Sequence, residues 1–134
     1  MERLPIDAQD RKLIAAAREV LRRNYHHERH SVGAAVLCSS GRIYAGINVE
    51  ACGYGPCAEP IAIGTAFSNG ERKINAIVAV CKNGRGYPVL SPCGNCRQLI
   101  FYYAPDAAVI YSDKGKTAKA RARDLLPGAY RSHF

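Results

Sequence analysis

Three cysteines and one glutamate have the types and spacing of a metal site that does chemistry. Cys93 and Cys96 form a Cys-x-x-Cys pair, whose two sulfurs reach one ion when the second cysteine lies in a helical turn. Cys57 is a third potential ligand, and three protein ligands are typical of a catalytic zinc site that keeps its fourth position for water. Glu59 follows Cys57 by two residues, so its carboxylate can reach that water without binding the metal.

The stretches Cys57-Ala58-Glu59 and Pro92-Cys93-Gly94-Asn95-Cys96 are together the three-cysteine form of a zinc nucleobase-deaminase signature. From roughly Tyr25 to Tyr130 the sequence resembles the small three-cysteine cytidine deaminases, and it also resembles the blasticidin S deaminase branch of that superfamily. The resemblance implies a cofactor, Zn²⁺ held by the three cysteines. It also implies an activity, the hydrolytic deamination of a free cytosine nucleoside such as cytidine or deoxycytidine.

The same resemblance assigns roles to further residues, position by position. Glu59 is the catalytic acid and base, which takes a proton from the zinc-bound water and passes protons to the ring nitrogen and the departing amine. Ser91 matches the residue whose backbone carbonyl receives the exocyclic amine, and the backbone of Ala58 matches a contact to the base edge. Asn48 and Glu50 match the pair that holds the sugar hydroxyls.

Other positions concern the charge of the centre and a neighbouring subunit. Arg97 directly follows Cys96 and is expected to hydrogen-bond a ligand sulfur, which offsets the negative charge of three thiolates on Zn²⁺. Pro60 stands where related cytidine deaminases usually have a second arginine. Tyr130 matches an aromatic residue that approaches the base in a neighbouring subunit. Together with the apolar helix expected after Cys57, it implies a homotetramer.

The loop between Glu50 and Cys57 leaves the choice of nucleoside open. It has only six residues, fewer than typical cytidine deaminases have, and Gly55-Pro56 before Cys57 matches the blasticidin S branch. Glu50 itself matches the cytidine enzymes, because a carboxylate suits a ribose with free hydroxyls. We therefore expect cytidine or deoxycytidine as the substrate, with a modified cytosine nucleoside such as blasticidin S as the alternative.

A closed structural zinc site is the alternative from another functional class. Cys52 and Cys57, with Cys93 and Cys96, have an acceptable spacing for a Cys₄ site, and such a protein would be a binding module. Glu59 would then have no purpose in a buried helix start. A deaminase that acts on a base in tRNA or DNA is a further alternative. Because such enzymes commonly use histidine as the first ligand, a free nucleoside is preferred.

Length, charge and cysteine content help to choose between these alternatives. The chain has 134 residues, which suits a single domain over residues 1–134. Its formal net charge of +8 is concentrated toward the two ends, where surface charge explains it as well as a nucleic-acid track does. There is no apolar run of the ~20 residues that a membrane helix needs, and the N-terminus does not resemble a signal peptide. Its six cysteines then favour metal binding in a reducing cytoplasm over disulfides.

The elements that must position these residues follow from hydrophobic periodicity and from turn residues. Gly33-Ala34-Ala35 keeps the first strand thin, which would let a helix pack closely on it. The order of elements predicts a three-layer α/β/α sandwich around a mixed sheet. The expected helices cover residues 7–24, 57–69, 93–103 and part of 121–126, and the expected strands cover 31–38, 42–48, 74–82 and 107–112.

Overall fold

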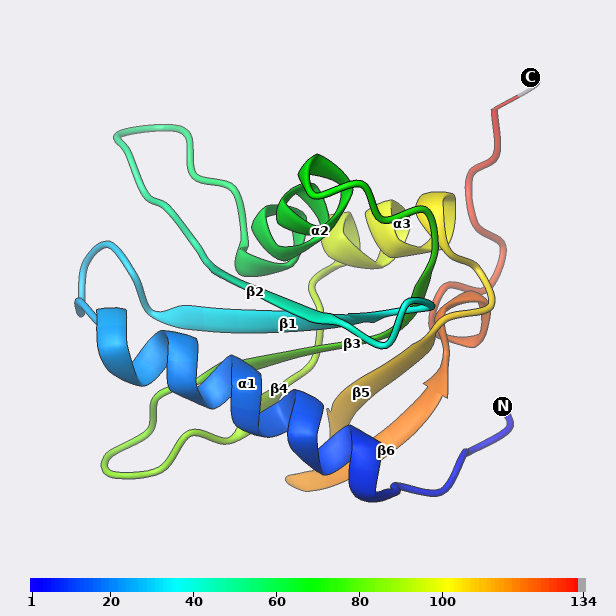
Figure 1. Cartoon of the computed structure of the whole chain (residues 1–134), viewed down its shortest axis with the longest axis horizontal. Coiled ribbons are helices and arrows are strands. Elements are labelled where there is room, and N and C mark those ends of the chain that lie inside the picture. Colours follow the sequence, from blue (N-terminus) through cyan, green and yellow to red (C-terminus); the bar gives the residue numbers. More distant parts are fainter. Residues whose placement is uncertain (133–134) are drawn as a thin grey trace.

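A mixed β-sheet forms the middle layer, with one helix against one face and two helices against the other (Figure 1). The computed structural model describes residues 1–132. This arrangement confirms the predicted three-layer sandwich. The helices are α1 (Ala8–Asn24), α2 (Ala58–Ser68), α3 (Gly94–Tyr103) and the 3₁₀ helix η1 (Ala122–Leu125). The strands are β1 (Val32–Cys38), β2 (Ile43–Ile47), β3 (Ile74–Cys81), β4 (Val89–Leu90), β5 (Ala108–Asp113) and β6 (Lys116–Arg121).

The order of the strands places the start of α3 at one end of the sheet. The order is β2-β1-β3-β5-β6, and β4 pairs with β3 outside this path. β3 and β5 are parallel, whereas the other pairs are antiparallel. A connection between parallel strands must return along the sheet, so α3 begins near the end at which β5 finishes. Ser91, just before α3, accordingly hydrogen-bonds Ser112 near the end of β5.

Helix α1 begins where the sequence predicts, at a reciprocal capping box. The Asp7 side chain accepts a hydrogen bond from the backbone N–H of Asp10, and the Asp10 side chain accepts one from that of Asp7. A Cβ added at Gly33 in β1 would lie only 2.6 Å from the carbonyl oxygen of Ala17. The thin first strand therefore does let α1 approach closely, as predicted.

Helix α2 packs equally closely on the other face of the sheet. A Cβ added at Gly46 in β2 would lie 2.7 Å from Cγ2 of Ile61 and 2.8 Å from the backbone nitrogen of Ala62. Because these contacts lie in the first half of α2, they fix the end of the helix that carries Glu59. The remaining apolar residues form two clusters, one on each face of the sheet. Within residues 1–132, no helix combines the length and apolar character needed to cross a membrane.

Two strands, β4 and β6, go beyond the sequence prediction. In β6 the buried residues are Ala118 and Ala120. The remaining four are Lys116, Thr117, Lys119 and Arg121, three of which are basic. The only buried residues are alanines, so the period-2 pattern is weak and the expected strands do not include this segment. Charged side chains are typical of an edge strand, where they discourage pairing with another chain. β4 has two residues, too few to show any periodicity.

Candidate active site

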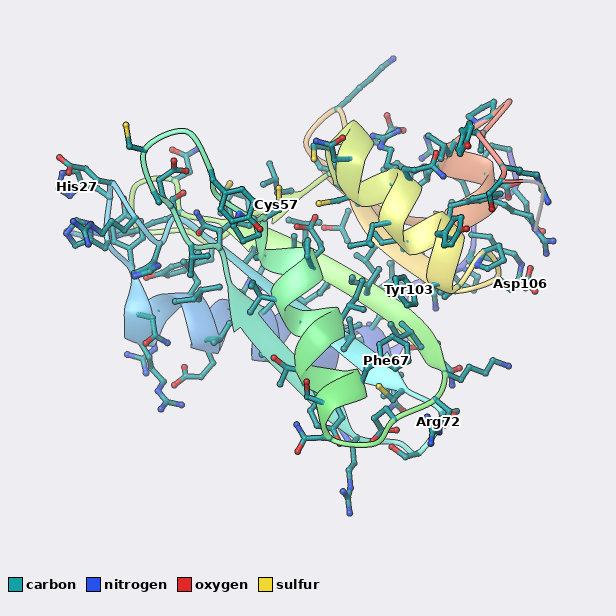
Figure 2. The ribbon with its side chains drawn as sticks, turned by 90° about the horizontal axis from the view of Figure 1, so that it is seen from above. His27, Cys57, Phe67, Arg72, Tyr103 and Asp106 are labelled. Carbon is teal, nitrogen blue, oxygen red and sulfur yellow. The ribbon has the colours of Figure 1, made fainter. Side chains whose placement is uncertain are left out.

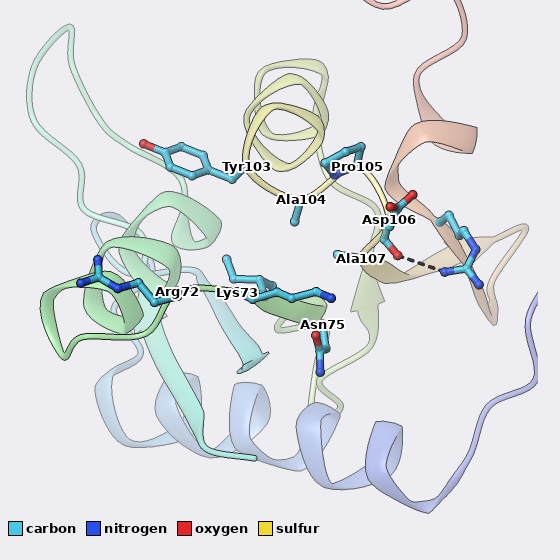
Figure 3. Close-up of a pocket in the computed structure, with 10 residues that line it drawn as sticks. Arg72, Lys73, Asn75, Tyr103, Ala104, Pro105, Asp106 and Ala107 are labelled. Atoms are coloured by element: carbon cyan, nitrogen blue, oxygen red, sulfur yellow. Dashed lines mark hydrogen bonds between the residues drawn. The ribbon is translucent and has the colours of Figure 1, made fainter. Parts of the chain in front are cut away.

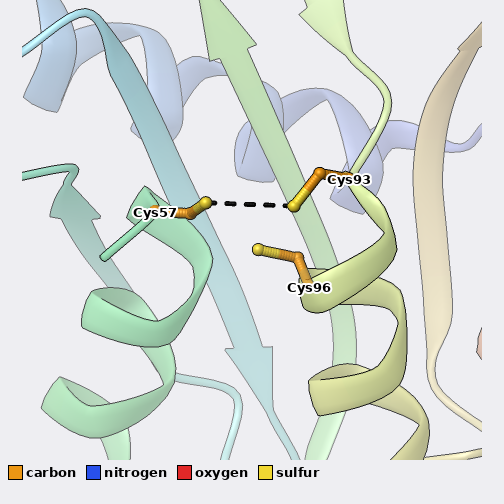
Figure 4. A group of neighbouring side chains, drawn as sticks. All are labelled: Cys57, Cys93 and Cys96. Atoms are coloured by element: carbon orange, nitrogen blue, oxygen red, sulfur yellow. Dashed lines mark hydrogen bonds between the residues drawn. The ribbon is translucent and has the colours of Figure 1, made fainter. Parts of the chain in front are cut away.

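The sulfurs of Cys57, Cys93 and Cys96 lie within 4.8 Å of one another (Figure 4). Cys57 and Cys93 are the N-cap residues of α2 and α3, and Cys96 lies in the first turn of α3. The Sγ atoms of Cys57 and Cys93 are 3.9 Å apart. Sulfurs bound tetrahedrally at roughly 2.3 Å from Zn²⁺ would be about 3.8 Å apart, so this pair already has the separation that zinc requires.

Cys52 lies outside this cluster. It is exposed on the loop that follows β2 and lines a shallow surface hollow together with Glu28, Arg29 and Gly53. Among residues 1–132, the three-cysteine cluster is the only group of three or more potential metal ligands. The structure therefore gathers three thiols and keeps Cys52 apart from them, which does not fit the closed Cys₄ alternative.

The ionisation of the thiols depends on burial as well as on helix starts. Burial opposes ionisation of Cys93, but hydrogen bonds from the backbone N–H groups of Cys96 and Asn95 and from the neighbouring thiols lower its pKa. Burial raises the pKa of Cys57, which opposes the lowering that the start of a helix would give a free thiol. Burial also raises the pKa of Cys96, and the nearby Glu59 adds to this shift. Zinc binding itself favours the thiolates, because the ligands must lose their protons.

Glu59 is placed to handle protons beside the thiols. It is the second residue of α2 and is only 5% exposed. Burial raises the pKa of its carboxyl, while hydrogen bonds from its own backbone N–H and from Cys96 oppose that shift. A carboxyl whose pKa is raised toward neutrality suits a group that must both accept and return a proton.

A pocket of about 340 Å³ opens beside the cysteines and brings together most of the predicted site. This volume suits a small organic molecule. The residues that line it are Val32, Asn48, Glu50, Gly55, Pro56, Cys57, Glu59, Leu90, Ser91 and Cys93.

Comparison with known proteins decides which chemistry this arrangement serves. The family model of the cytidine and deoxycytidylate deaminase zinc-binding region matches residues 7–112. The chain belongs to this family. It is therefore a hydrolytic deaminase that acts on a C–N bond. Zn²⁺ is the cofactor of the family, and the three converging thiols have the donors and separations to hold it.

A blasticidin-S deaminase and several cytidine deaminases are similar to this chain. A blasticidin-S deaminase of Bacillus cereus is 39% identical over 137 residues, covering 97% of this chain and 98% of the relative. A cytidine deaminase of Halalkalibacterium halodurans is 36% identical over 108 residues, covering 78% and 80%. The crystal structure of a cytidine deaminase from Burkholderia pseudomallei matches with a TM-score of 0.75 at 31% identity, covering 90% of this chain and 98% of that one.

Asn48 uses most of its side chain to hold the backbone beside the pocket. Its Oδ1 accepts hydrogen bonds from the backbone N–H groups of Ser31 at 2.8 Å and Val32 at 2.9 Å, and its Nδ2 donates to the carbonyl of Arg29 at 3.3 Å. Nδ1 of His30 lies 2.9 Å from the carbonyl oxygen of Asn48. One amide hydrogen of Asn48 remains for a substrate. This clamp could not be predicted from residue types, because its partners are backbone groups.

The side chain of Ser91 also makes hydrogen bonds to the backbone. Its hydroxyl donates to the carbonyl of Ser112 at 2.8 Å and accepts from the N–H of Ser112 at 3.1 Å. Its backbone carbonyl, the group to which the resemblance gives a role, is not used by these bonds. Ala58 is fully buried in the core in the absence of a substrate. Both substrate contacts stay predictions.

Arg97 braces the cysteine loop by contacts other than the predicted one. Its Nε donates to the carbonyl of Pro92 at 2.8 Å and its Nη1 to the carbonyl of Leu125 at 3.1 Å. Pro92 directly precedes Cys93, so these bonds tie the start of α3 to η1. Within residues 1–132 the guanidinium makes hydrogen bonds to carbonyls and none to a ligand sulfur. A backbone carbonyl is a stronger hydrogen-bond acceptor than a thiol sulfur, which favours these partners.

Tyr130 does not reach the pocket of its own chain. Its side chain is 72% exposed, and it lines a different hollow beside Tyr102 and Arg131. The side-chain amide of Gln98 donates to the carbonyl of Tyr130 at 3.1 Å and so holds this segment against α3. The expected role of Tyr130 concerns a neighbouring subunit and stays a prediction.

A larger hollow of about 420 Å³ lies at the other ends of α2 and α3 (Figure 3). Arg72, Lys73, Tyr103 and Asp106 are among its lining residues, and none of the lining residues is a cysteine, histidine or serine. Asp106 supplies its one carboxylate, which pairs with Arg123 at 2.6 Å. This hollow therefore lacks the donors and the proton-transfer groups that the smaller pocket contains.

Proposed function

We propose that this protein hydrolyses the exocyclic amine of a free cytosine nucleoside, converting cytidine or deoxycytidine with water into the uracil nucleoside and ammonia. One observation carries the proposal. A single pocket gathers two of the three thiols, the buried Glu59, and the three residues expected to hold the base and the sugar, Asn48, Glu50 and Ser91.

In this proposal Glu59 moves the protons of the reaction. When bound, Zn²⁺ supplies a Lewis acid that makes a water acidic near neutral pH. The carboxylate of Glu59 accepts a proton from that water and delivers it to the ring nitrogen, which makes C4 electrophilic. The water oxygen bonds to C4, and Glu59 carries the second proton to the amine, which leaves as ammonia. Because Glu59 is buried, bulk water competes little for these protons.

The groups around Glu59 orient the nucleoside. The carbonyl of Ser91 is proposed to accept a hydrogen bond from the exocyclic amine, and the backbone of Ala58 to contact the base edge. Glu50 and the free amide hydrogen of Asn48 are proposed to hold the sugar hydroxyls. The Asn48 clamp and the bond of Ser91 to β5 keep these groups fixed before the substrate arrives, which lowers the entropic cost of binding.

Blasticidin S is the second candidate substrate. The similarity to a blasticidin-S deaminase extends over 97% of this chain, and the loop before Cys57 is short. Glu50 argues for an ordinary riboside, because its carboxylate lines the pocket and can accept hydrogen bonds from free sugar hydroxyls. We therefore place cytidine and deoxycytidine first, with moderate tolerance of modified sugars.

A parallel ultraviolet assay tests this choice. Cytidine, deoxycytidine, cytosine, adenosine and blasticidin S are each given to the zinc-loaded enzyme and to its Glu50→Ala variant. The variant is expected to raise KM for the ribosides roughly ten- to a hundredfold and to leave cytosine unaffected. Turnover of blasticidin S alone, with no effect of Glu50→Ala, would show that the short loop is the better guide and that the proposed substrate is wrong.

We also propose that the enzyme is a homotetramer that works in the cytoplasm in pyrimidine salvage. Exposed aromatic side chains support the assembly, among them Tyr54 in the loop before Cys57, Tyr102 and Tyr103 on α3, and Tyr130. The cysteines of the chain are all free in the structure, and thiol ligands persist best in a reducing compartment.

A further inference from the structure

We propose that Gly55 is a positioning residue for Glu50: its missing side chain leaves the space that the Glu50 carboxylate occupies at the pocket. The inference rests on the proposed function, since it assumes that Glu50 holds the sugar of the substrate. It links the short loop before Cys57 to the selection of nucleosides with free sugar hydroxyls.

The loop that contains both residues is a tight hairpin between β2 and α2, which projects from the body of the molecule (Figure 1). The N–H of Val49 donates to the carbonyl of Pro56 at 3.2 Å, which closes the base of the hairpin. Ala51 and Tyr54 exchange two backbone hydrogen bonds of 2.8 and 3.1 Å at its tip. Gly53 takes a φ of +85° in that turn, a conformation that favours glycine.

Gly55 lies directly against Glu50 across this hairpin. A Cβ added at Gly55 would lie 2.9 Å from Oε2 of Glu50, 2.8 Å from the carbonyl oxygen of Val49 and 3.2 Å from Cα of Glu50. Two of these three atoms are backbone, so the hairpin cannot relieve the contact by turning a side chain alone. Any residue larger than glycine must therefore move either the carboxylate of Glu50 or the loop backbone that carries it.

The ends of the loop leave little room for such a movement. Asn48, at its start, is clamped to the backbone of residues 29–32 by its side chain. Cys57, at its end, is the N-cap of α2 and one of the three clustered thiols (Figure 2). With six residues between Glu50 and Cys57, the strain of an added methyl group falls on Glu50 itself.

The side chain of Glu50 also has a second space next to it that it could occupy. It lines both the pocket with the cysteines and the neighbouring surface hollow that contains Glu28, Arg29 and Cys52. Gly55 lines only the first of these two spaces. A methyl group at position 55 would therefore fill space on the pocket side and displace the carboxylate toward the outer hollow, where it no longer meets a sugar.

The test is a double-mutant cycle of Gly55→Ala and Glu50→Ala, with Gly86→Ala as the matched control. A Cβ at Gly86 would meet only the carbonyl oxygen of Asn83, at an ordinary 3.6 Å. Zinc content is measured for each zinc-loaded variant. The kinetic readout is kcat/KM for cytidine divided by kcat/KM for 2′,3′-dideoxycytidine, which keeps the base and lacks the sugar hydroxyls.

Gly55→Ala is expected to keep zinc and to lower this ratio about tenfold or more, mainly through KM for cytidine. It should lower the ratio no further when Glu50 is already alanine, because no carboxylate remains to be displaced. Gly86→Ala should match the parent enzyme. A parental ratio in Gly55→Ala, an undiminished effect in the Glu50→Ala background, or loss of zinc from Gly55→Ala would each overturn the inference. An unchanged ratio in Glu50→Ala alone would instead refute the proposed role of Glu50.

Discussion

Three thiolates give a zinc centre a net charge of −1, and the residues around it decide how that charge is balanced. Pro60 follows Glu59 where the resemblance to cytidine deaminases predicts an arginine, so the chain has no cation at that position. Cys57 and Cys93 cap two helices, whose N-terminal ends carry partial positive charge. Arg97 adds a full positive charge just behind the loop, through its bond to the carbonyl of Pro92. The backbone thus supplies part of the compensation that a second arginine would give.

Cys93 and Cys52 should differ in what their loss does to zinc binding. Purified protein should contain about one zinc per chain, and Cys93→Ser should lose it because two thiols hold the ion poorly. Cys52→Ser is the matched control and should keep the metal, since Cys52 lies outside the cluster. Metal analysis after dialysis measures both variants. Loss of zinc from Cys52→Ser as complete as that from Cys93→Ser would restore the Cys₄ alternative.

Glu59→Gln separates metal binding from proton transfer. The amide is nearly isosteric and should leave zinc content and folding unchanged, but it cannot accept the proton of the water. We expect kcat to fall roughly 10²- to 10⁴-fold, the usual contribution of a general acid and base. Zinc content and circular dichroism control for misfolding. Turnover near the parent rate would remove Glu59 from the mechanism.

Residue types and spacing were enough to predict the cluster of cysteines, because Cys-x-x-Cys and a Cys-x-Glu at helix starts impose their own geometry. Sequence did not predict the contacts of Asn48, Ser91 and Arg97, because each of these side chains binds backbone carbonyls or N–H groups. Every residue has a backbone carbonyl, so residue types do not show which backbone group a side chain will bind. Only the fold decides that.

At the scale of elements, the buried ion pair between α1 and β6 stabilises an edge of the sheet. Asp10 is only 3% exposed, and its carboxylate lies 2.7 Å from Nζ of Lys119 on β6. Lys119→Met should lower the free energy of unfolding by roughly 3 kcal/mol, because a buried carboxylate loses its cation. The exposed Lys116 lies on the same strand, and Lys116→Met should change stability by less than about 0.5 kcal/mol.

Chemical denaturation of the two zinc-loaded variants at equal chain concentration measures this difference. Equal stabilities of Lys119→Met and Lys116→Met would show that the pair contributes nothing to the fold.

The elements with strong periodicity or caps, such as α1 with Asp7 and β3 with its Val/Ile run, could be predicted to within a residue or two. β6 could not, because alanine and lysine favour helix or loop as much as strand and only pairing with β5 decides its state.

At the scale of the whole molecule, the layer formed by α2 and α3 has the features of a surface that packs against another chain. Helix α2 is apolar on most sides, yet Gly64 leaves an open space on its outer side, with no atom within 4 Å of an added Cβ. Phe67 on α2 and Tyr103 on α3 lie against each other, with ring centroids 5.3 Å apart (Figure 2). Tyr130 is exposed and does not line the pocket of its own chain. A neighbouring chain would both cover these residues and receive Tyr130.

Light scattering tests the proposed homotetramer, for which the expected mass is four times the 14.6 kDa of one chain. Gly64→Arg is the informative variant. A single chain has open space for the arginine side chain at this position, whereas a neighbouring chain packed on α2 would occupy that space. It should keep zinc and helix content, dissociate to smaller species, and lose activity because Tyr130 no longer reaches a neighbouring site. Tyr130→Ala should lose activity without dissociating. A monomer at all concentrations with full activity would contradict both the assembly and the shared site.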